Sequence, residues 1–252
     1  MFGFFKKKRH ETIQQDDAHD WSFLTTDMHS HFIPGIDDGP ATMPESIALL
    51  KFMAQAGYSK IVTTPHISLD YFPDTEPKIA PGLALLQKAA AEHNVQLEIK
   101  AAAEYMIDEG LLEKLHRKEK LLSINGEFVL IEMGFVQPSP LLYQTIFEIQ
   151  AAGYQPVLAH PERYNYYHEA SSMADLHKLK NSGCLFQLNT IALSGYYGKH
   201  VKIFAEKLLK EALYDFAGSD IHHERHVKAL NAVKNSSTYA LLTKYPFKNS
   251  KI

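Results

Sequence analysis

The stretch Gln155-Pro156-Val157-Leu158-Ala159-His160 decides the fold class, because an unbroken apolar run from Pro156 to Ala159 stops at a histidine. A second stretch, Phe128-Val129-Leu130-Ile131-Glu132, has the same form and ends on a glutamate. A strand with one solvent-exposed face alternates apolar and polar residues, whereas a strand covered on both faces is apolar throughout. These two stretches therefore predict strands of a parallel sheet that is covered by helices.

Similar runs alternate with helical patterns along the chain from about residue 23 onward. We predict seven strands, at residues 23–29, 60–66, 95–104, 128–135, 155–160, 185–189 and 215–222. Apolar residues at helical spacing predict helices at residues 44–57, 81–93, 111–119, 141–153, 173–183, 201–213 and 225–234. The alternation is typical of βα units and predicts an α/β fold.

The length of 252 residues is compatible with one domain, since α/β barrels routinely fill about 250 residues as a single unit. We assign residues 1–22 to an N-terminal extension that we expect to be flexible, and residues 23–252 to the α/β domain. The extension carries Lys6-Lys7-Lys8-Arg9 after a short apolar run, which is the reverse of the order in a secretory signal. We interpret it as a solvated tail, with weak contact to acidic lipid and hence proximity to a membrane as the alternative.

The composition excludes several classes of protein. The chain is 45% hydrophobic and 22% charged, which excludes disorder, and its lone cysteine, Cys184, excludes an intramolecular disulfide framework. A net charge of -3 argues against a nucleic-acid-binding protein. No stretch approaches the roughly 18 apolar residues that cross a bilayer, so no transmembrane segment is expected. We predict a cytoplasmic location, because an unpaired cysteine suits a reducing compartment.

Residues of metal-ligand types lie at or beside the ends of six of the seven predicted strands. In chain order these residues are His29, His31, His66, Glu104, Glu132, His160, Asp220 and His222. The carboxyl ends of parallel strands meet at one edge of the sheet, where α/β folds gather their ligands. Five histidines and three carboxylates exceed the needs of one tetrahedral zinc ion, so two or three divalent ions are predicted. Ligands without a thiolate fit zinc, manganese or iron.

Paired divalent ions favour in-line displacement at phosphorus, because they stabilise both the attacking and the leaving oxygen. Arg163 follows His160 and Arg225 follows His222, each by three residues, and a guanidinium group matches the geometry of a phosphate. A cysteine-dependent phosphatase is excluded, because the sixth residue after Cys184 is Thr190 rather than arginine. Tyrosines crowd the same predicted loops, and we take Tyr105 and Tyr164 as candidate substrate contacts. The sequence therefore predicts metal-dependent hydrolysis of a phosphoester.

Five motifs together resemble one known group of proteins. They are Asp27-Met28-His29-Ser30-His31, Ile36-Asp37-Asp38-Gly39-Pro40, Thr64-Pro65-His66, His160-Pro161-Glu162-Arg163-Tyr164 and Ser219-Asp220-Ile221-His222. In this order they resemble the polymerase-and-histidinol-phosphatase (PHP) superfamily, and within it the bacterial manganese-dependent protein-tyrosine phosphatases of capsule and exopolysaccharide loci. The resemblance covers about residues 24–230.

The resemblance implies a single distorted (β/α)7 barrel, similar to a TIM barrel, with three metal ions. It implies one ion held by His29, His31, Glu104 and Asp220, and a second by Glu104, Glu132 and His160. It implies a third ion held by Asp38, His66 and His222, so that Asp38 joins the ligands only through the resemblance. Manganese is the expected metal, with iron and zinc as alternatives.

The resemblance also implies a substrate and a partner. The substrate is phosphotyrosine on the tail of a bacterial tyrosine kinase that controls polysaccharide synthesis. We hypothesise that hydroxide at the metal site attacks phosphorus while Arg163 and Arg225 hold the nonbridging oxygens. Two alternatives remain open at this point. One is a phosphatase of histidinol phosphate or another small molecule, and the other is a binding module without catalytic activity.

Overall fold

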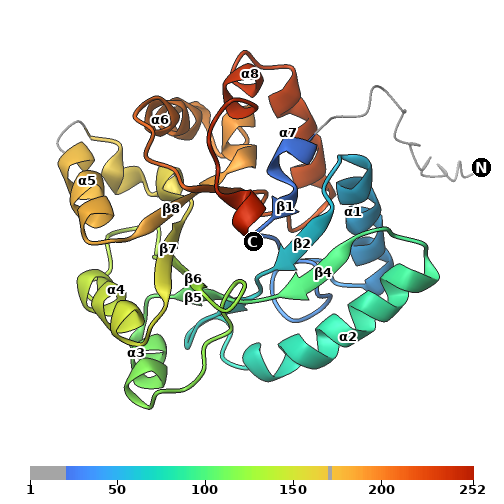
Figure 1. Cartoon of the computed structure of the whole chain (residues 1–252), viewed down its shortest axis with the longest axis horizontal. Coiled ribbons are helices and arrows are strands. Elements are labelled where there is room, and N and C mark those ends of the chain that lie inside the picture. The colour runs from blue at the N-terminus through green and yellow to red at the C-terminus, as the bar shows by residue number, and fades with distance from the viewer. Residues whose placement is uncertain (1–20, 170–171) are drawn as a thin grey trace, which may run out of the picture.

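The strands of the computed structural model form a ring, and the helices lie outside it (Figure 1). The structure describes residues 21–169 and 172–252. The strands are β1 (Thr26–Asp27), β2 (Lys60–Thr63), β3 (His66–Ile67), β4 (Glu98–Ala101), β5 (Glu104–Met106), β6 (Phe128–Glu132), β7 (Gln155–Ala159), β8 (Leu185–Asn189) and β9 (Phe216–Gly218). They pair in parallel as two sheets, β1-β2-β4 and β3-β5-β6-β7-β8-β9. The predicted α/β barrel is confirmed.

The helices cover the outside of this ring. They are α1 (Met43–Gln55), α2 (Glu76–Glu92), α3 (Glu109–His116), α4 (Leu142–Ala151), α5 (Met173–Asn181), α6 (Lys199–Lys210), α7 (Glu224–Lys234) and α8 (Tyr239–Leu242). Short 3-10 helices are η1 (Ser22–Leu24), η2 (Pro161–Arg163), η3 (Asn165–Tyr167), η5 (Thr190–Ser194) and η6 (Asn249–Lys251). No helix in the described ranges is long and apolar enough to cross a membrane.

Two predicted strands are broken in the middle, and the break positions the site. The run 60–66 divides into β2 and β3, and the run 95–104 divides into β4 and β5. Pro65 lies at the first break, where its missing N–H prevents the ladder from continuing. After the break, His66 pairs with Glu104 in the second sheet. The distortion of the barrel therefore brings two predicted ligands side by side.

The ends of the ring are joined near β1 and β9. Ser30 forms an isolated parallel bridge with Ile221, and the N–H of Asp220 donates to the carbonyl of His29 at 2.7 Å. Between β1 and β9 themselves, the side chain of Asn249 takes the place of a strand neighbour. Its Nδ2 donates to the carbonyls of Thr26 and Ala217, and its Oδ1 accepts from the N–H of Ala217. We call this junction between β1 and β9 the seam, and the buried side chain of Asn249 bridges the two strands there.

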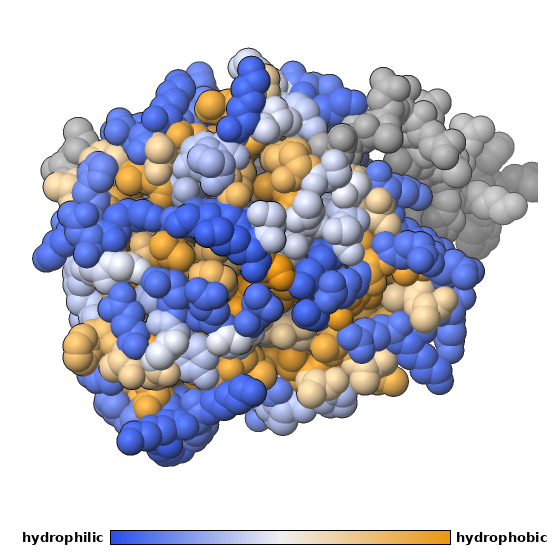
Figure 2. All heavy atoms as spheres, in the orientation of Figure 1, coloured by the Kyte–Doolittle hydropathy of each residue, from blue (hydrophilic) through white to orange (hydrophobic). Residues whose placement is uncertain are grey.

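Strand alternation separates an inner core from an outer one. Phe128 and Leu130 pack inside the barrel with residues such as Val157 and Ile252. Val129 and Ile131 instead join the larger cluster between the strands and the helices. On the face of the barrel drawn in Figure 2, charged and polar residues surround smaller hydrophobic areas. Because side chains alternate between the two faces of a strand, Glu132, the last residue of β6, points into the barrel as Phe128 and Leu130 do.

Several predicted boundaries differ from the structure. The predicted strand 23–29 is mostly irregular, with η1 followed by the short β1. Helix α2 begins at Glu76 and contains Pro81, which was predicted to open it, and α8 was not predicted. Residues 1–20 of the predicted extension lie outside the described residues. Trp21 is already fully buried and stacks on Phe23, so the packed core begins slightly before residue 23.

Candidate metal centre

The predicted ligands converge at the carboxyl end of the barrel. His29, His31, Glu104 and Asp220 are all within 1% of complete burial, and each offers a ligand atom within 4.8 Å of the others. The Nε2 atom of His29 lies 3.1 Å from a carboxylate oxygen of Glu104 and 3.3 Å from one of Asp220. Two Nε2 atoms, of His29 and His31, face each other at 3.3 Å. Ligands about 2.1 Å from one tetrahedral ion lie about 3.4 Å apart, so this cluster has the dimensions of a metal site.

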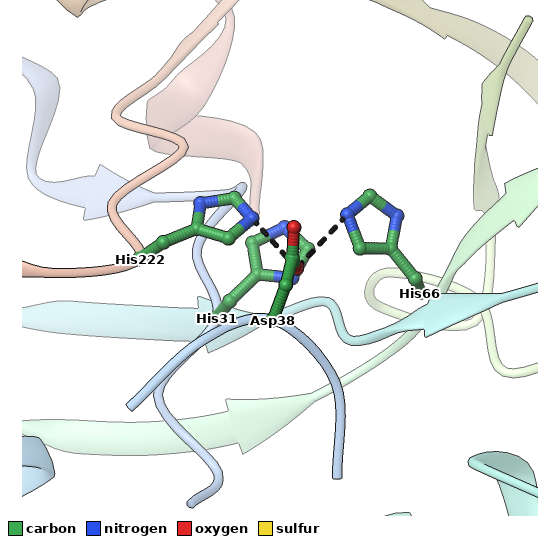
Figure 3. A group of neighbouring side chains, drawn as sticks. All are labelled: His31, Asp38, His66 and His222. Atoms are coloured by element: carbon green, nitrogen blue, oxygen red, sulfur yellow. Dashed lines mark ion pairs between the residues drawn. The ribbon is translucent and has the colours of Figure 1, made fainter. Parts of the chain in front are cut away.

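A second group lies beside the first and shares His31 with it. It consists of His31, Asp38, His66 and His222, whose rings and carboxylate point toward one another in Figure 3. One oxygen of Asp38 lies 3.2 Å from Nε2 of His222 and 3.5 Å from Nε2 of His66. The ring of His31 stacks on that of His222 with a centroid distance of 3.9 Å. This group contains the whole set that the resemblance implies for the third ion.

The third group differs in one member from the set expected for the second ion. Glu104 and Glu132 converge with His66, whose Nδ1 lies 3.2 Å and 2.8 Å from their carboxylates. The expected third member, His160, lies on the other side of Glu104, with its Nε2 at 3.1 Å from Oε1. The Nδ1 of His160 is buried without a hydrogen-bond partner among the described residues. His160 thus turns Nε2 toward the carboxylate of Glu104 and leaves its other ring nitrogen unpaired, and a buried imidazole of this kind fits a metal ligand.

Polar side chains behind the ligands fix the orientation of two histidine rings. The Nδ1–H of His29 donates to Gln187 at 2.9 Å, and the Nδ1–H of His31 donates to Asp37 at 2.7 Å. Each bond places the ring proton on Nδ1 and leaves the Nε2 lone pair directed into the cluster. Neither Asp37 nor Gln187 is among the site residues predicted from the sequence. The available signals were the Asp-Asp-Gly turn and the inward register of β8.

The backbone is adapted to the approach of these side chains. His160 and Asp220 have φ angles of 36° and 54°, in the left-handed region that residues other than glycine seldom adopt. Gly218 lies under His29, and a Cβ atom there would come within 2.6 Å of the Cβ of His29. Strained residues of this kind persist where the surrounding structure holds them, and they gather at functional sites.

The electrostatics of the cluster are those of carboxylates that require cations. Burial opposes the ionised forms of Glu104 and Asp220, but the surrounding histidines hold the pKa of each carboxyl well below its usual range. Burial likewise opposes the charge of His66, yet Glu132 and Glu104 raise its pKa to about 9. By contrast, burial and then Arg163 lower the pKa of His160. Divalent ions would supply the positive charge without protonated rings, so the residues present fit a metal centre.

Arg163 lies at the edge of this centre and is held on three sides. It donates from Nη1 to Asp220 at 2.7 Å. Its guanidinium carbon lies 4.9 Å from the ring centre of Phe135 and 4.3 Å from that of Tyr197. Burial opposes its charge, but Asp220 raises its pKa, so the guanidinium stays charged.

Arg163 and part of the metal centre line one open cavity of about 280 Å³. Its lining residues are Asp38, His66, Glu132, Phe135, Arg163, Tyr197, Asp220, His222, His223 and His226. Burial lowers the pKa of His226 to about 3, and the ring accepts a hydrogen bond from the backbone N–H of His222. The lining of the cavity therefore combines candidate metal ligands, the cation of Arg163 and the aromatic rings of Phe135 and Tyr197.

Three predicted substrate contacts do not reach this cavity. Arg225 is exposed in the first turn of α7, because the helix turns it away while His226 faces inward. Tyr105 points into the outer core, where its hydroxyl accepts from the N–H of Leu122. Tyr164 is fully buried and its hydroxyl accepts from the N–H of Met133. The two tyrosines were wrong as substrate contacts, and Phe135 and Tyr197 occupy the cavity instead.

Comparisons with known proteins show which family this chain is similar to. A family model described as capsular polysaccharide synthesis, CpsB/CapC, matches residues 25–239. Tyrosine-protein phosphatase YwqE of Bacillus subtilis (strain 168) is 30% identical over 216 residues, which cover 85% of this chain and 83% of that protein. Tyrosine-protein phosphatase CpsB of Streptococcus pneumoniae is 30% identical over 202 residues, which cover 78% and 82%.

Two solved structures are similar to this chain. A crystal structure described as YwqE from Bacillus subtilis and CpsB from Streptococcus pneumoniae, unique metal-dependent tyrosine phosphatases, matches with a TM-score of 0.76 and 26% identity over 90% of each chain. Histidinol phosphate phosphatase from Lactococcus lactis, solved with zinc, L-histidinol and phosphate, matches with a TM-score of 0.52 and 14% identity over 89% of this chain and 94% of that chain. The second likeness shows the barrel fold alone.

Proposed function

This chain belongs to the CpsB/CapC family of capsular polysaccharide synthesis, and from that premise we propose that it is a metal-dependent tyrosine-protein phosphatase. The observation that carries the proposal is the meeting of three ligand groups with Arg163 around a single cavity. Histidine and carboxylate clusters alone fit many metal enzymes. A fixed guanidinium beside them adds a site for an anion, and a phosphate monoester is an anion of matching geometry.

The proposed metal ligands are the residues named above: His29, His31, Asp38, His66, Glu104, Glu132, His160, Asp220 and His222. We propose manganese, with iron and zinc as alternatives that the same ligands accept. When bound, the ions supply activated water and neutralise charge on the phosphoryl group. Asp37 and Gln187 would keep the rings of His31 and His29 in the orientation that the ions need.

The protein's own part in catalysis rests on Arg163. One of its nitrogens is bound to Asp220, and the guanidinium carries further N–H donors for the nonbridging oxygens of the substrate. Because Asp220 and the two flanking rings hold the group in place, little reorganisation is needed as charge develops. Arg225, the other proposed phosphate ligand, is exposed and outside the lining of the cavity. The proposal therefore depends on Arg163.

We propose that the substrate is a phosphotyrosine on a protein, and that this protein is a bacterial tyrosine kinase of a polysaccharide locus. The names of the relatives support phosphotyrosine, and the family description supports the polysaccharide context. The cavity opens to solvent, which suits a side chain presented by a macromolecule. A phosphatase of histidinol phosphate is the competing candidate.

The test is hydrolysis by the metal-stripped protein with and without added manganese. The substrates are a phosphotyrosine peptide, a phosphoserine peptide and histidinol phosphate. We expect manganese-dependent hydrolysis with preference for phosphotyrosine. Equal or faster turnover of histidinol phosphate would replace the proposal with the competing one. If no substrate is hydrolysed by protein of verified metal content, the chain is a binding module and the proposal fails.

A further inference from the structure

Phe135 is a partly exposed aromatic residue at the edge of the cavity, and the only role described for it above is as a neighbour that holds Arg163. It lies in the loop between β6 and α4 and is 46% exposed. Single exposed hydrophobic residues are common, so exposure alone carries no conclusion. Its position is the informative feature, because its ring lines the same cavity as the candidate ligands.

The inner side of Phe135 is fixed by neighbours. Its ring stacks on that of His160 with centroids 6.1 Å apart and lies 5.7 Å from that of Tyr164. The guanidinium carbon of Arg163 lies 4.9 Å from its centre. Tyr164 in turn is buried and bonded to the backbone of Met133, the residue after β6. The ring of Phe135 is therefore backed by packed groups while part of its surface faces solvent.

This placement has a consequence for any phosphate monoester bound by Arg163. The phosphoryl oxygens take the guanidinium, so the group esterified to the phosphate extends from the same point into the cavity. The ring of Phe135 lies 4.9 Å from the guanidinium carbon, so an aryl group that extends from a phosphate on Arg163 comes within reach of its exposed part. Two aromatic rings pair favourably when their centroids are about 4.5–7 Å apart. Tyr197, on the other side of Arg163, is less exposed, and its hydroxyl accepts from Asn189.

We propose that Phe135 is a specificity-determining residue whose ring packs against the aromatic ring of an aryl phosphate held by Arg163. The inference rests on the proposed function and deepens it, because it supplies a physical reason for the proposed preference for phosphotyrosine over alkyl phosphates. The other lining residues in the described ranges, apart from Tyr197, are charged side chains or histidines.

The experiment compares two classes of substrate on the manganese-loaded full chain. Phe135→Ala should raise KM for p-nitrophenyl phosphate and for a phosphotyrosine peptide by about tenfold, the loss of one aromatic pair. KM for glycerol 3-phosphate should stay within about twofold of the wild type, and Phe135→Tyr should restore the wild-type preference. Phe147→Ala removes a more exposed phenylalanine on α4, 66% exposed, and should change neither value. An equal loss with both classes of substrate would overturn the proposal, because Phe135 would then act only through Arg163.

A binding measurement separates this inference from the proposed function. Calorimetric titration with phenylphosphonate and methylphosphonate requires no turnover. Tighter binding of phenylphosphonate to the wild type, lost in Phe135→Ala, would support the role of Phe135 even if phosphotyrosine peptides were not hydrolysed. Equal affinity of the wild type for the two phosphonates would overturn it, whatever the enzyme hydrolyses. Phe135→Leu repeats both measurements with a variant that retains apolar packing against His160.

Discussion

At the residue scale, a functional side chain and a structural one are often neighbours in the same strand, because consecutive residues point to opposite faces of the sheet. Glu104 ends its predicted strand facing into the barrel, whereas the next residue, Tyr105, faces the helices. The same alternation directs Glu132 inward and Ile131 outward. Residue type alone does not show this difference, since tyrosine suits both a packed core and a substrate contact.

Arg163 and Arg225 are the sharpest comparison at this scale, because the sequence predicts the same role for both. We expect Arg163→Ala to lower kcat/KM by about two orders of magnitude or more, the usual loss when a preorganised donor to a developing charge is removed. Arg225→Ala should stay within about threefold of the wild type, because its side chain is exposed and outside the lining of the cavity. Steady-state kinetics at equal manganese content measure both. A large loss in Arg225→Ala would mean that α7 moves toward the substrate.

Asp37 gives a prediction about metal affinity rather than about chemistry. Asp37→Asn removes the carboxylate that accepts from Nδ1 of His31, so the ring loses the partner that fixes its orientation. Loss of such a partner typically weakens metal binding by about 10–100-fold. Competition with a chromophoric chelator would measure the change, and Asp70→Asn, at an exposed position, is the matched control. Unchanged affinity in Asp37→Asn would show that His31 is oriented by the ions themselves.

The site was only partly predictable from the sequence, and the reason is physical. Strand ends are local features, so the residues His29, His31 and His66 could be selected from the pattern of apolar runs. Gln187 bonds to His29 across 158 residues, so no local pattern links the two. Asp37 lies close to its partner His31 in the sequence, but the bond depends on the path of the turn between them, which the apolar pattern does not predict. Phe135 was missed for a similar reason, since its position next to Arg163 depends on the folding of two loops.

At the element scale, buried polar residues form hydrogen bonds between the strands of the barrel and the helices and loops outside them. Glu162, in η2, is fully buried and accepts from the N–H of Asn189, the last residue of β8, and from the hydroxyl of Tyr214. Burial raises the pKa of this carboxyl to about 7. These bonds set the position of η2, and through it the position of Arg163. The precise course of η2 was not predictable from the apolar pattern, because polar contacts between distant elements determine it.

Asp215 is the element-scale residue whose effect on stability is easiest to measure. It precedes β9, accepts from the N–H of Phe186 at 2.9 Å, and pairs with Lys180 and Lys248. Burial opposes its ionised form, but the bonds to Lys180 and Lys248 hold the pKa of its carboxyl below the usual value. Asp215→Asn should therefore lower the free energy of unfolding at pH 7 by about 2 kcal/mol.

The pH dependence of this effect has a definite sign. A carboxyl with a depressed pKa in the folded state stabilises fully above its unfolded pKa of about 4, and that contribution is lost as pH falls through the folded value. The difference between the wild type and Asp215→Asn should consequently shrink below about pH 4. Urea unfolding across pH 3–7 would reveal it, with Asp70→Asn as the control. A difference that stays constant over this range would assign the effect to packing instead of charge.

At the scale of the whole molecule, the metal centre and the closure of the barrel are two separate sources of stability. The ligand residues come from β3, β5, β6 and the segments after β1, β7 and β9, so bound ions would connect most of the ring. Asn249 closes the seam between β1 and β9 at Thr26 and Ala217, just before the ligand residues that follow these strands. The fold class was predictable from the sequence, since the βα alternation runs along the whole domain. The seam was not, because it depends on one asparagine far along the chain.

Removal of metal should lower the melting temperature of the whole barrel, and the two sources of stability should act independently. An ion that binds only the folded state adds about 2.7 kcal/mol to the free energy of unfolding when its free concentration is 100 times its dissociation constant.

Asn249→Ala leaves three backbone groups of Thr26 and Ala217 without their partner, so its melting temperature should be lower with and without manganese. Since the bonds of Asn249 go to Thr26 and Ala217 and not to a candidate ligand, the increment from manganese should be the same in this variant as in the wild type. In Asp220→Asn that increment should be reduced, because a buried candidate ligand loses its charge. Thermal unfolding of the three chelator-treated proteins over a manganese titration gives all six melting temperatures. A manganese increment that disappears in Asn249→Ala would show that the seam and the metal centre unfold as one unit.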